Sequence, residues 1–261
     1  MIRARKRFGQ HFLEPAWVAK VISAINPASD DHFIEIGPGR GALTLPLAAK
    51  AGRVIAVEID RDLAGDLAKK APSNLVVLEG DFLDATVRER LAGLVAAAGA
   101  SFRVAGNLPY NVASPILFSL VDLYAVGMRM VDANVMLQRE VADRLLAQPG
   151  TKTYGAMTVL IGHDARVERL LNLPRGAFRP APKVLSTVVR LSFHPPQPAV
   201  RDAELFRNIV QAAFSRRRKT IANALAPMRG AKALPDWLDG TRRAETLAIA
   251  EFARLADDFS R

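Results

Sequence analysis

The segment Asn107-Leu108-Pro109-Tyr110 combines residue types that can accept hydrogen bonds from an amino group and stack against a flat ring. The amide of Asn107 offers a carbonyl oxygen as an acceptor. Pro109 disfavours the α region for Leu108, which leaves the Leu108 carbonyl free to accept as well. Tyr110 adds a flat apolar face on which a nucleobase can stack. The segment therefore suits the exocyclic amine of a base, although a proline turn whose tyrosine packs in the core would contain the same residues.

Earlier in the chain, groups suited to a nucleoside follow successive predicted strands. Gly37, Gly39 and Gly41 form a turn that lets a ligand approach the backbone, with G-x-G-x-G spacing rather than the G-x-G-x-x-G of dinucleotide folds. Glu58 comes about 20 residues later, where a carboxylate can bridge two ribose hydroxyls; a solvated strand end is the alternative. Asp81 ends the third strand and can accept from an adenine amino group. This order fits S-adenosylmethionine (SAM), which has no phosphates, better than NAD.

Alternating strands and helices must position these groups. Apolar runs and helical spacing predict four strand–helix repeats, the pattern of an α/β fold with a parallel sheet covered on both faces. The strands are expected at 32–36, 53–59, 75–81 and 101–106, and the helices at 15–25, 42–50, 62–70 and 86–98. Asn107 then lies at the carboxyl edge of the sheet, where open α/β sheets bind ligands.

The remaining chain is expected to complete the sheet and then to become helical. A buried strand, a helix and a hairpin or edge strand are expected at 134–137, 140–147 and 184–193. The proline-rich segment 194–198 is the best candidate boundary. We therefore expect one domain over 1–195, with a basic N-terminal arm, and a helical domain over 196–261.

Composition indicates a soluble globular protein that handles a polyanion. The chain has 36 Lys+Arg against 26 Asp+Glu, a formal charge of +10, and 50% hydrophobic residues. That balance is typical of nucleic-acid binding, although a basic proteome would also produce it. With no cysteine and four scattered histidines, neither disulfides nor a metal site is expected. No apolar run approaches the roughly 20 residues of a membrane span, and no secretory signal is evident, so a cytoplasmic protein is expected. Nothing indicates an oligomer, so a monomer is expected.

Taken together, the motifs resemble those of the ribosomal RNA adenine N6,N6-dimethyltransferases, most closely the bacterial small-subunit group. The resemblance runs from Arg5 to about Leu225. It is carried by the segments 7–13, 35–39, 57–60, 80–81, 107–111, 153–155, 178–184 and 213–219.

The resemblance implies a Rossmann-like class I SAM-dependent methyltransferase domain followed by a small all-helical C-terminal domain. It also implies that the SAM site is lined by His11, Leu13, Gly37, Glu58, Asp81 and Asn107. Many relatives carry asparagine at the position of His11. The resemblance further implies that Phe178 closes over the target adenine opposite Tyr110. Considered locally, an aromatic residue in a proline-flanked loop need not be buried, which agrees with that role.

The mechanism expected from these residues is direct displacement at the sulfonium methyl group by adenine N6. Hydrogen bonds accepted by Asn107 and the Leu108 carbonyl would favour a tetrahedral, more nucleophilic nitrogen, so no strong base is required. Tyr110 and Phe178 would hold the base and tolerate positive charge through cation–π contact.

Two basic clusters are candidates for holding the RNA while the adenine is unstacked, a step that costs a few kcal/mol. They are the arm Arg3, Arg5, Lys6 and Arg7 and the C-terminal cluster Arg216, Arg217, Arg218 and Lys219. Such runs are also common on solvated faces.

The leading hypothesis is dimethylation of two adjacent adenosines in the 3′-terminal hairpin of 16S rRNA, in the small ribosomal subunit, with a role in ribosome biogenesis. One alternative is a non-catalytic ribosome-assembly or RNA-binding factor. Another is a 23S rRNA adenine methyltransferase of the macrolide-resistance type, which would share the pocket.

Overall fold

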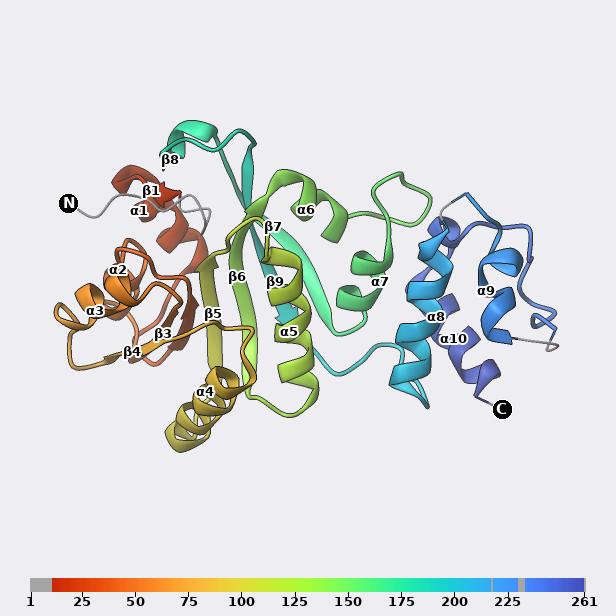
Figure 1. Cartoon of the computed structure of the whole chain (residues 1–261), viewed down its shortest axis with the longest axis horizontal. Helices are drawn as coiled ribbons and strands as arrows, with labels where there is room; N and C mark the ends of the chain where they lie inside the picture. The colour runs from red at the N-terminus through yellow and green to blue at the C-terminus, as the bar shows by residue number, and fades with distance from the viewer. Residues whose placement is uncertain (1–10, 217, 230–232, 261) are drawn as a thin grey trace. The chain divides into compact units, whose positions relative to one another are not determined.

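The computed structural model describes residues 11–216, 218–229 and 233–260, which form two compact units (Figure 1). The first unit takes the chain as far as Ala142, together with Glu168–Phe193. The second takes Asp143–Val167 and the chain from His194 onward. Each unit is described by itself below.

A seven-stranded sheet with the order β4-β3-β2-β5-β6-β9-β7 forms the framework (Figure 1). Its strands are β2 (His32–Ile36), β3 (Arg53–Glu58), β4 (Leu75–Glu79), β5 (Phe102–Asn107), β6 (Met130–Gln138), β7 (Ala165–Leu173) and β9 (Ser186–Phe193). Neighbouring strands from β4 to β6 run parallel, and β9 is antiparallel to β6. A short ribbon pairs β1 (Phe12–Leu13) with β8 (Phe178–Arg179).

Helices connect the parallel strands, as an α/β fold requires. The connecting helices are α2 (Thr44–Ala48), α3 (Arg61–Ala68), α4 (Ala85–Ala98) and α5 (Ala113–Ala125). α1 (Pro15–Ile25) precedes β2, α6 (Arg139–Leu145) follows β6, and a 3-10 turn, η2, covers Arg175–Ala177. α1 starts with proline at its first position and ends at Asn26, whose φ of 53° is left-handed. Asp60 accepts from the backbone N–H groups of Asp62 and Leu63 and so starts α3 directly after β3. These caps keep the strand ends and helix starts close together.

One face of the sheet is buried against α1 and α2. Phe33, Val54 and Ala56 of this face are fully buried in one cluster with Ile22 of α1 and Leu47 of α2. Burying such side chains contributes roughly 1.5–3 kcal/mol each relative to exposure. Because side chains alternate along a strand, burial of these residues also determines the face of the sheet from which the polar side chains at the carboxyl edge project.

The predicted α/β architecture is confirmed, and the largest difference concerns the last strands. β2 and α1 have the predicted bounds, and the β5 strand leads into Asn107 as expected. The segment 184–193 is not an edge strand, because β9 lies between β6 and β7. At this end of the sheet the edge strand is β7, and the opposite edge is β4. The sequence did not indicate β7, because Arg166, Glu168 and Arg169 interrupt its apolar residues on both faces.

The second unit is built from helices around its own core. They are α7 (Ala156–Gly162), α8 (Ala203–Ser215), α9 (Ile221–Arg229) and α10 (Ile249–Phe259), with a 3-10 turn, η3, at Ala244–Thr246. Phe206, Ile209 and Val210 of α8 are buried, as is Phe252 of α10.

This unit starts earlier than the predicted boundary between residues 195 and 196, since it includes 143–167. Tyr154 is buried, donates its hydroxyl to the Leu247 carbonyl oxygen and packs against Phe214 at 6.0 Å between ring centroids. The His163 ring, just after α7, lies 4.3 Å from that of Phe206. The apolar helix α7 therefore finds its partners in a part of the chain that follows the proline-rich segment.

Within the described residues, every helix is too short or too polar to cross a membrane.

Candidate active site

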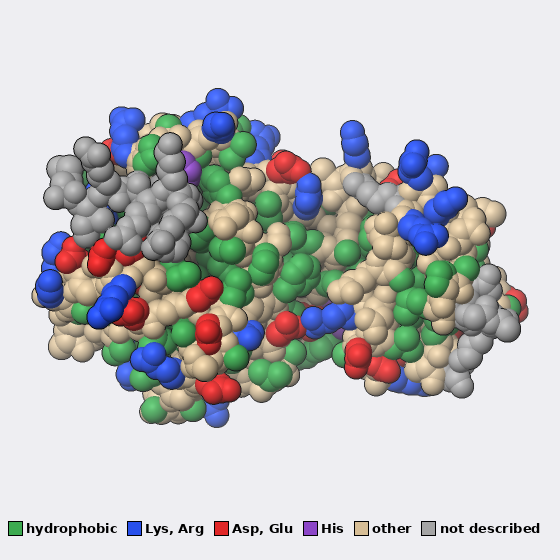
Figure 2. All heavy atoms as spheres, in the orientation of Figure 1, with side chains coloured by type: hydrophobic (Ala, Val, Ile, Leu, Met, Phe, Trp, Pro, Cys, Tyr) green, Lys and Arg blue, Asp and Glu red, His purple; other side chains and the backbone are tan. Residues whose placement is uncertain are grey.

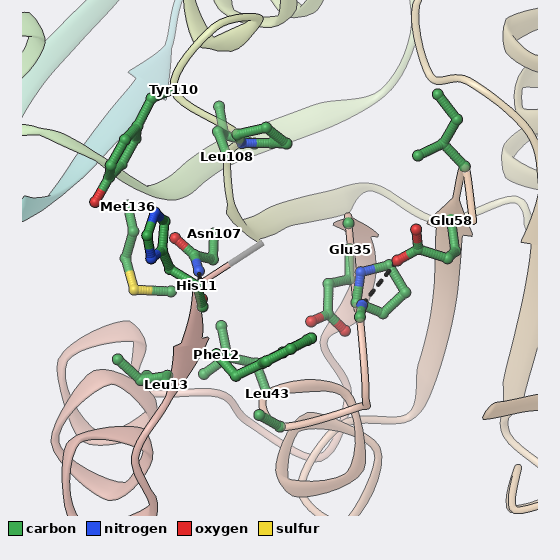
Figure 3. Close-up of a pocket in the computed structure, with 16 residues that line it drawn as sticks. His11, Phe12, Leu13, Glu35, Leu43, Glu58, Asn107, Leu108, Tyr110 and Met136 are labelled. Carbon is green, nitrogen blue, oxygen red and sulfur yellow. Dashed lines mark hydrogen bonds between the residues drawn. The ribbon is translucent and has the colours of Figure 1, made fainter. Parts of the chain in front are cut away.

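A pocket opens at the carboxyl ends of β2, β3 and β5 (Figure 3). It brings together eight of the predicted site residues, namely His11, Leu13, Gly37, Glu58, Asn107, Leu108, Pro109 and Tyr110. They come from β1, from the glycine-rich turn after β2 and from the ends of β3 and β5. The parallel topology explains why segments so far apart in the sequence meet at one edge.

The turn after β2 needs glycine at the positions that face the pocket. Gly37 and Gly39 have φ angles of 69° and 58°, a conformation that other residues rarely adopt. A Cβ atom at Gly39 would lie 3.3 Å from the Phe12 ring. The turn therefore exposes backbone to a ligand where side chains would obstruct it.

Glu58 is a buried, fixed carboxylate rather than a solvated strand end. Its side chain is 4% exposed. Its two oxygens accept from the backbone N–H groups of Gly39 (2.8 Å) and Asp60 (2.9 Å). Burial raises the pKa of Glu58, and these hydrogen bonds act in the opposite direction. Each carboxylate oxygen can accept a further bond, so the group can still receive ribose hydroxyls.

Asn107 is oriented by the strand that covers the pocket. Its Nδ2 donates to the His11 carbonyl oxygen at 2.8 Å, which leaves Oδ1 as the acceptor for a ligand (Figure 3). Leu108 is 1% exposed, and its backbone N–H donates to Met136. Within the described residues, no hydrogen bond is made to the Leu108 carbonyl oxygen. Two acceptors are thus available beside each other.

Tyr110 is half-buried and lines the pocket, so its ring is not packed away in the core. Its hydroxyl lies 2.7 Å from Ser186 Oγ, and burial raises the pKa of the phenol. The His11 ring stacks on it with centroids 5.7 Å apart. His11 Nδ1 lies 2.7 Å from the Pro180 carbonyl oxygen and is the donor, since a carbonyl can only accept. His11 therefore acts both through its backbone, on Asn107, and through its ring, on Tyr110.

Two predicted site residues are not among those that line the pocket. Asp81 is exposed, and its Oδ1 accepts from the Leu83 backbone N–H at 2.9 Å, which stabilises the turn after β4. Phe178 is 0% exposed, and the expectation that it need not be buried is wrong. The residue pairs with Leu13 between β8 and β1, so its ring is drawn into the core cluster against α1.

Sequence reasoning missed Glu35, which lines the same pocket at 1% exposure. Burial raises its pKa to about 8, and the neighbouring Glu58 adds to the increase. Its Oε2 has no hydrogen-bond partner within the described residues. The available signal was a glutamate between Ile34 and Ile36 in an apolar strand, because a buried carboxyl group is costly unless it serves a purpose.

Of the basic candidates, Arg216, Arg218 and Lys219 are exposed in the second unit, between α8 and α9. The backbone N–H of Lys219 donates to the Arg216 carbonyl oxygen, which forms a turn there. Lys and Arg side chains also stand out on each unit in Figure 2. Arg217 and the arm residues Arg3, Arg5, Lys6 and Arg7 lie outside the described residues.

No group of three or more histidine, cysteine or acidic residues suited to a metal ion occurs in the part of the chain that the structure describes. A mostly parallel sheet, a glycine-rich turn, a carboxylate at the end of β3 and an amide at the end of β5 together define the Rossmann-like SAM-dependent methyltransferases.

Comparison with known proteins places the chain within that class. The sequence model for ribosomal RNA adenine dimethylase matches residues 1–260, and the chain belongs to this family. Its class as an rRNA adenine dimethyltransferase, predicted from the motifs, is thereby confirmed.

Curated relatives and solved structures match this chain over nearly its whole length. Two proteins called ribosomal RNA small subunit methyltransferase A are similar to this chain. The one from Aromatoleum aromaticum is 42% identical over 98% of this chain and 94% of its own length, and that from Bordetella avium is 43% identical over 98% and 95%. A dimethyladenosine transferase from Plasmodium falciparum superposes with a TM-score of 0.74 at 25% identity, covering 96% of this chain and 98% of its own. The 23S rRNA methyltransferase ErmE superposes with a TM-score of 0.67 at 23% identity, covering 96% of this chain and 100% of its own. This match shows similarity of fold alone.

Proposed function

We propose that this protein transfers methyl groups from SAM to N6 of two adjacent adenosines in the 3′-terminal hairpin of 16S rRNA, two methyl groups to each nitrogen, during biogenesis of the small ribosomal subunit. The observation that carries the proposal is the fixed orientation of the Asn107 amide, whose Nδ2 is held by the His11 carbonyl. Relatives named for the small ribosomal subunit, matched over almost their entire length, support this choice of RNA.

The residues present fit SAM. The turn at Gly37 and Gly39 is a cradle that a Cβ atom would obstruct, and Glu35 provides a buried carboxyl oxygen that has no partner in the described chain. Glu58 would hold the ribose hydroxyls, and Leu13 and His11 would cover the pocket from β1. When bound, SAM supplies an electrophilic methyl group on a sulfonium.

Catalysis would depend on positioning rather than on a strong base. Asn107 Oδ1 and the Leu108 carbonyl oxygen accept from the two N–H groups of the adenine, which directs the N6 lone pair at the methyl group. Pro109 keeps the Leu108 carbonyl out of helical hydrogen bonding. The methylated nitrogen is acidic, so its proton can leave to water.

The target base would stack on Tyr110. In the described conformation Phe178 is buried, so its proposed contact with the base would require the ribbon of β1 and β8 to open. Asp81 would contact the adenine of SAM only if its carboxylate gives up the hydrogen bond from the Leu83 backbone N–H for one from the adenine. We propose further that the exposed residues Arg216, Arg218 and Lys219 contact RNA phosphates, together with Arg217 and the arm residues. The protein would act as a monomer in the cytoplasm, where ribosomal subunits assemble.

The test is incubation of the protein with small ribosomal subunits that lack the modification and with methyl-labelled SAM. We expect label in N6,N6-dimethyladenosine of 16S rRNA and little in naked 23S rRNA. Preference for 23S rRNA would favour the macrolide-resistance type instead. Binding to the subunit without any label would favour the assembly-factor alternative.

A further inference from the structure

Glu35 lies at the floor of the pocket, on the strand between those of Glu58 and Asn107. It pairs in register with Ala56 of β3 and Ala105 of β5. Glu58 and Asn107 stand two residues further along those strands, so the three polar side chains project from the same face of the sheet. The side chains of the two alanines are small, and in Figure 3 the Glu35 side chain lies between Asn107 and Glu58, with its carboxyl group directed toward Phe12 and Leu43.

Among the described residues that line the pocket, none supplies a cation to balance the charge of Glu35. Glu58, at the end of β3, faces Glu35, and Asp60 is a charged neighbour of Glu58. The pocket also receives His11 just before β1, Asn107 at the end of β5 and Met136 of β6. The Thr44 hydroxyl of α2 is close to the Glu35 carboxyl group. Neither lysine nor arginine is among the described residues that line the pocket. The nearby Arg40 guanidinium lies over the Phe12 ring at 4.3 Å.

A carboxyl group in such a position is expected to be neutral in the ligand-free protein. Burial raises the pKa of Glu35 to about 8, and Glu58 repels a second negative charge. A cation placed in the pocket has the opposite effect, because it favours the ionised form.

We propose that Glu35 makes the pocket sensitive to the charge of its ligand: it releases its proton to solvent when the cationic methyl donor binds and keeps it when the neutral demethylated product binds. The inference rests on the proposed function. If the ribose is held at Glu58 and the methyl group points to Asn107, the sulfonium of the donor lies between them, near Glu35, whereas the α-ammonium and α-carboxylate are common to donor and product and do not distinguish the two. The product, S-adenosylhomocysteine, has lost the sulfonium charge.

The consequence is that the pocket binds SAM in preference to S-adenosylhomocysteine. This preference would help the enzyme to replace the product by a new donor between successive transfers to one nitrogen. Because donor binding expels a proton, its affinity should rise with pH, by up to about tenfold per unit below pH 8 and level off above. Product affinity should stay nearly constant over the same range. The ratio of the two dissociation constants is therefore set by pH.

The test is calorimetric titration of the full-length protein at pH 7 in buffers with different ionisation enthalpies, such as phosphate and Tris. We expect about one proton released per SAM bound and close to none per S-adenosylhomocysteine. Equal proton counts for the two ligands would overturn the inference. This measurement uses the unaltered protein, so it does not depend on the folding of any variant.

Substitutions show which residue releases the proton when SAM binds. Glu35→Gln should abolish the release and flatten the pH dependence of SAM affinity, while S-adenosylhomocysteine still binds; Glu35→Asp should retain the release. Glu79→Gln is the matched control, because Glu79 of β4 is exposed and pairs in register with Glu58. This variant should release as many protons on binding SAM as the unaltered protein. Unchanged release in Glu35→Gln would remove Glu35 from this role.

The outcome separates this inference from the proposed function. If the unaltered protein methylates small subunits but gives equal proton counts, only the role of Glu35 fails. If it binds no SAM, or binds it without methylating rRNA, the proposed function fails.

Discussion

β5 carries a polar side chain near each end, and the two ends differ in how those side chains are used. Near its start, Arg103 makes a bidentate pair with Asp132 (3.0 Å for both bonds), binds Asp31 at 2.7 Å and donates to the Ile25 carbonyl at the end of α1. At its end, Asn107 uses its Nδ2 within the protein, while its Oδ1 accepts no hydrogen bond within the described residues.

The neighbouring residues follow the same division. The network of Arg103 and Asp132 extends to Asn134 in the middle of β6, which donates to Asp132 at 2.8 Å and accepts from Arg190 at 2.9 Å. Arg190 in turn donates to the carbonyls of Ala24 and Ile25. On the carboxyl side, Glu35 Oε2 has no partner in the described chain. Buried polar groups with every bond satisfied within the protein serve stability, whereas a buried group with unused capacity indicates a binding site.

The largest effect is expected on the amino side. Asp132→Asn would leave Arg103 and Arg190 without their shared carboxylate, and breaking a buried pair of this kind costs about 3–5 kcal/mol. Urea unfolding should show this loss, while kcat of the folded fraction stays within about twofold. A fall in kcat that matches the loss of stability would show that the two ends of the sheet are not independent.

Asn107→Ala should produce the opposite pattern. Loss of the Oδ1 acceptor should lower kcat for methyl transfer by about 100-fold or more, with RNA binding retained. Asn134→Ala is the matched control, because it removes the same side chain from the neighbouring strand β6, where both polar atoms are bonded within the protein, and should reduce stability without this loss of kcat. Equal loss of RNA binding and transfer in Asn107→Ala would identify Asn107 as a structural residue.

The smallest effect is expected for Tyr110→Phe. The variant loses the hydrogen bond to Ser186 but keeps the ring that we propose stacks on the base, so stability should fall by only about 1 kcal/mol and transfer by a few-fold. Tyr110→Ala, which removes the ring, should reduce transfer much more. Similar activities for the two variants would exclude stacking on this ring from the mechanism.

Much of the fold was predictable because its signals are local. Proline and a helical apolar spacing predicted α1, and a short apolar run predicted β2, both with the bounds that the structure has. β7 was missed because its mixed charged and apolar residues give no local signal; its place is set by pairing with β9. The start of the second unit was also missed, because α7 is covered by helices far along the chain.

For the site, residue type predicted which side chains could bind, but not how they are held. Glycines at 37 and 39, Glu58 and Asn107 were identified from their types and their places at strand ends, and all line one pocket. The burial of Phe178 and the use of Asp81 in a local turn were not visible in the sequence, and the entry of Glu35 into the pocket was indicated only by its place within an apolar strand. Each depends on which neighbours fill the surrounding space.

The sequence by itself determined the strand–helix alternation, the family and the chemical groups at the carboxyl edge, because these follow from local patterns and residue types. Only the tertiary structure decided which of those groups still have hydrogen-bonding capacity. Whether a carboxyl or amide oxygen is free depends on its distance to partners on other strands and on its exclusion from water, and the packing of the whole sheet sets both.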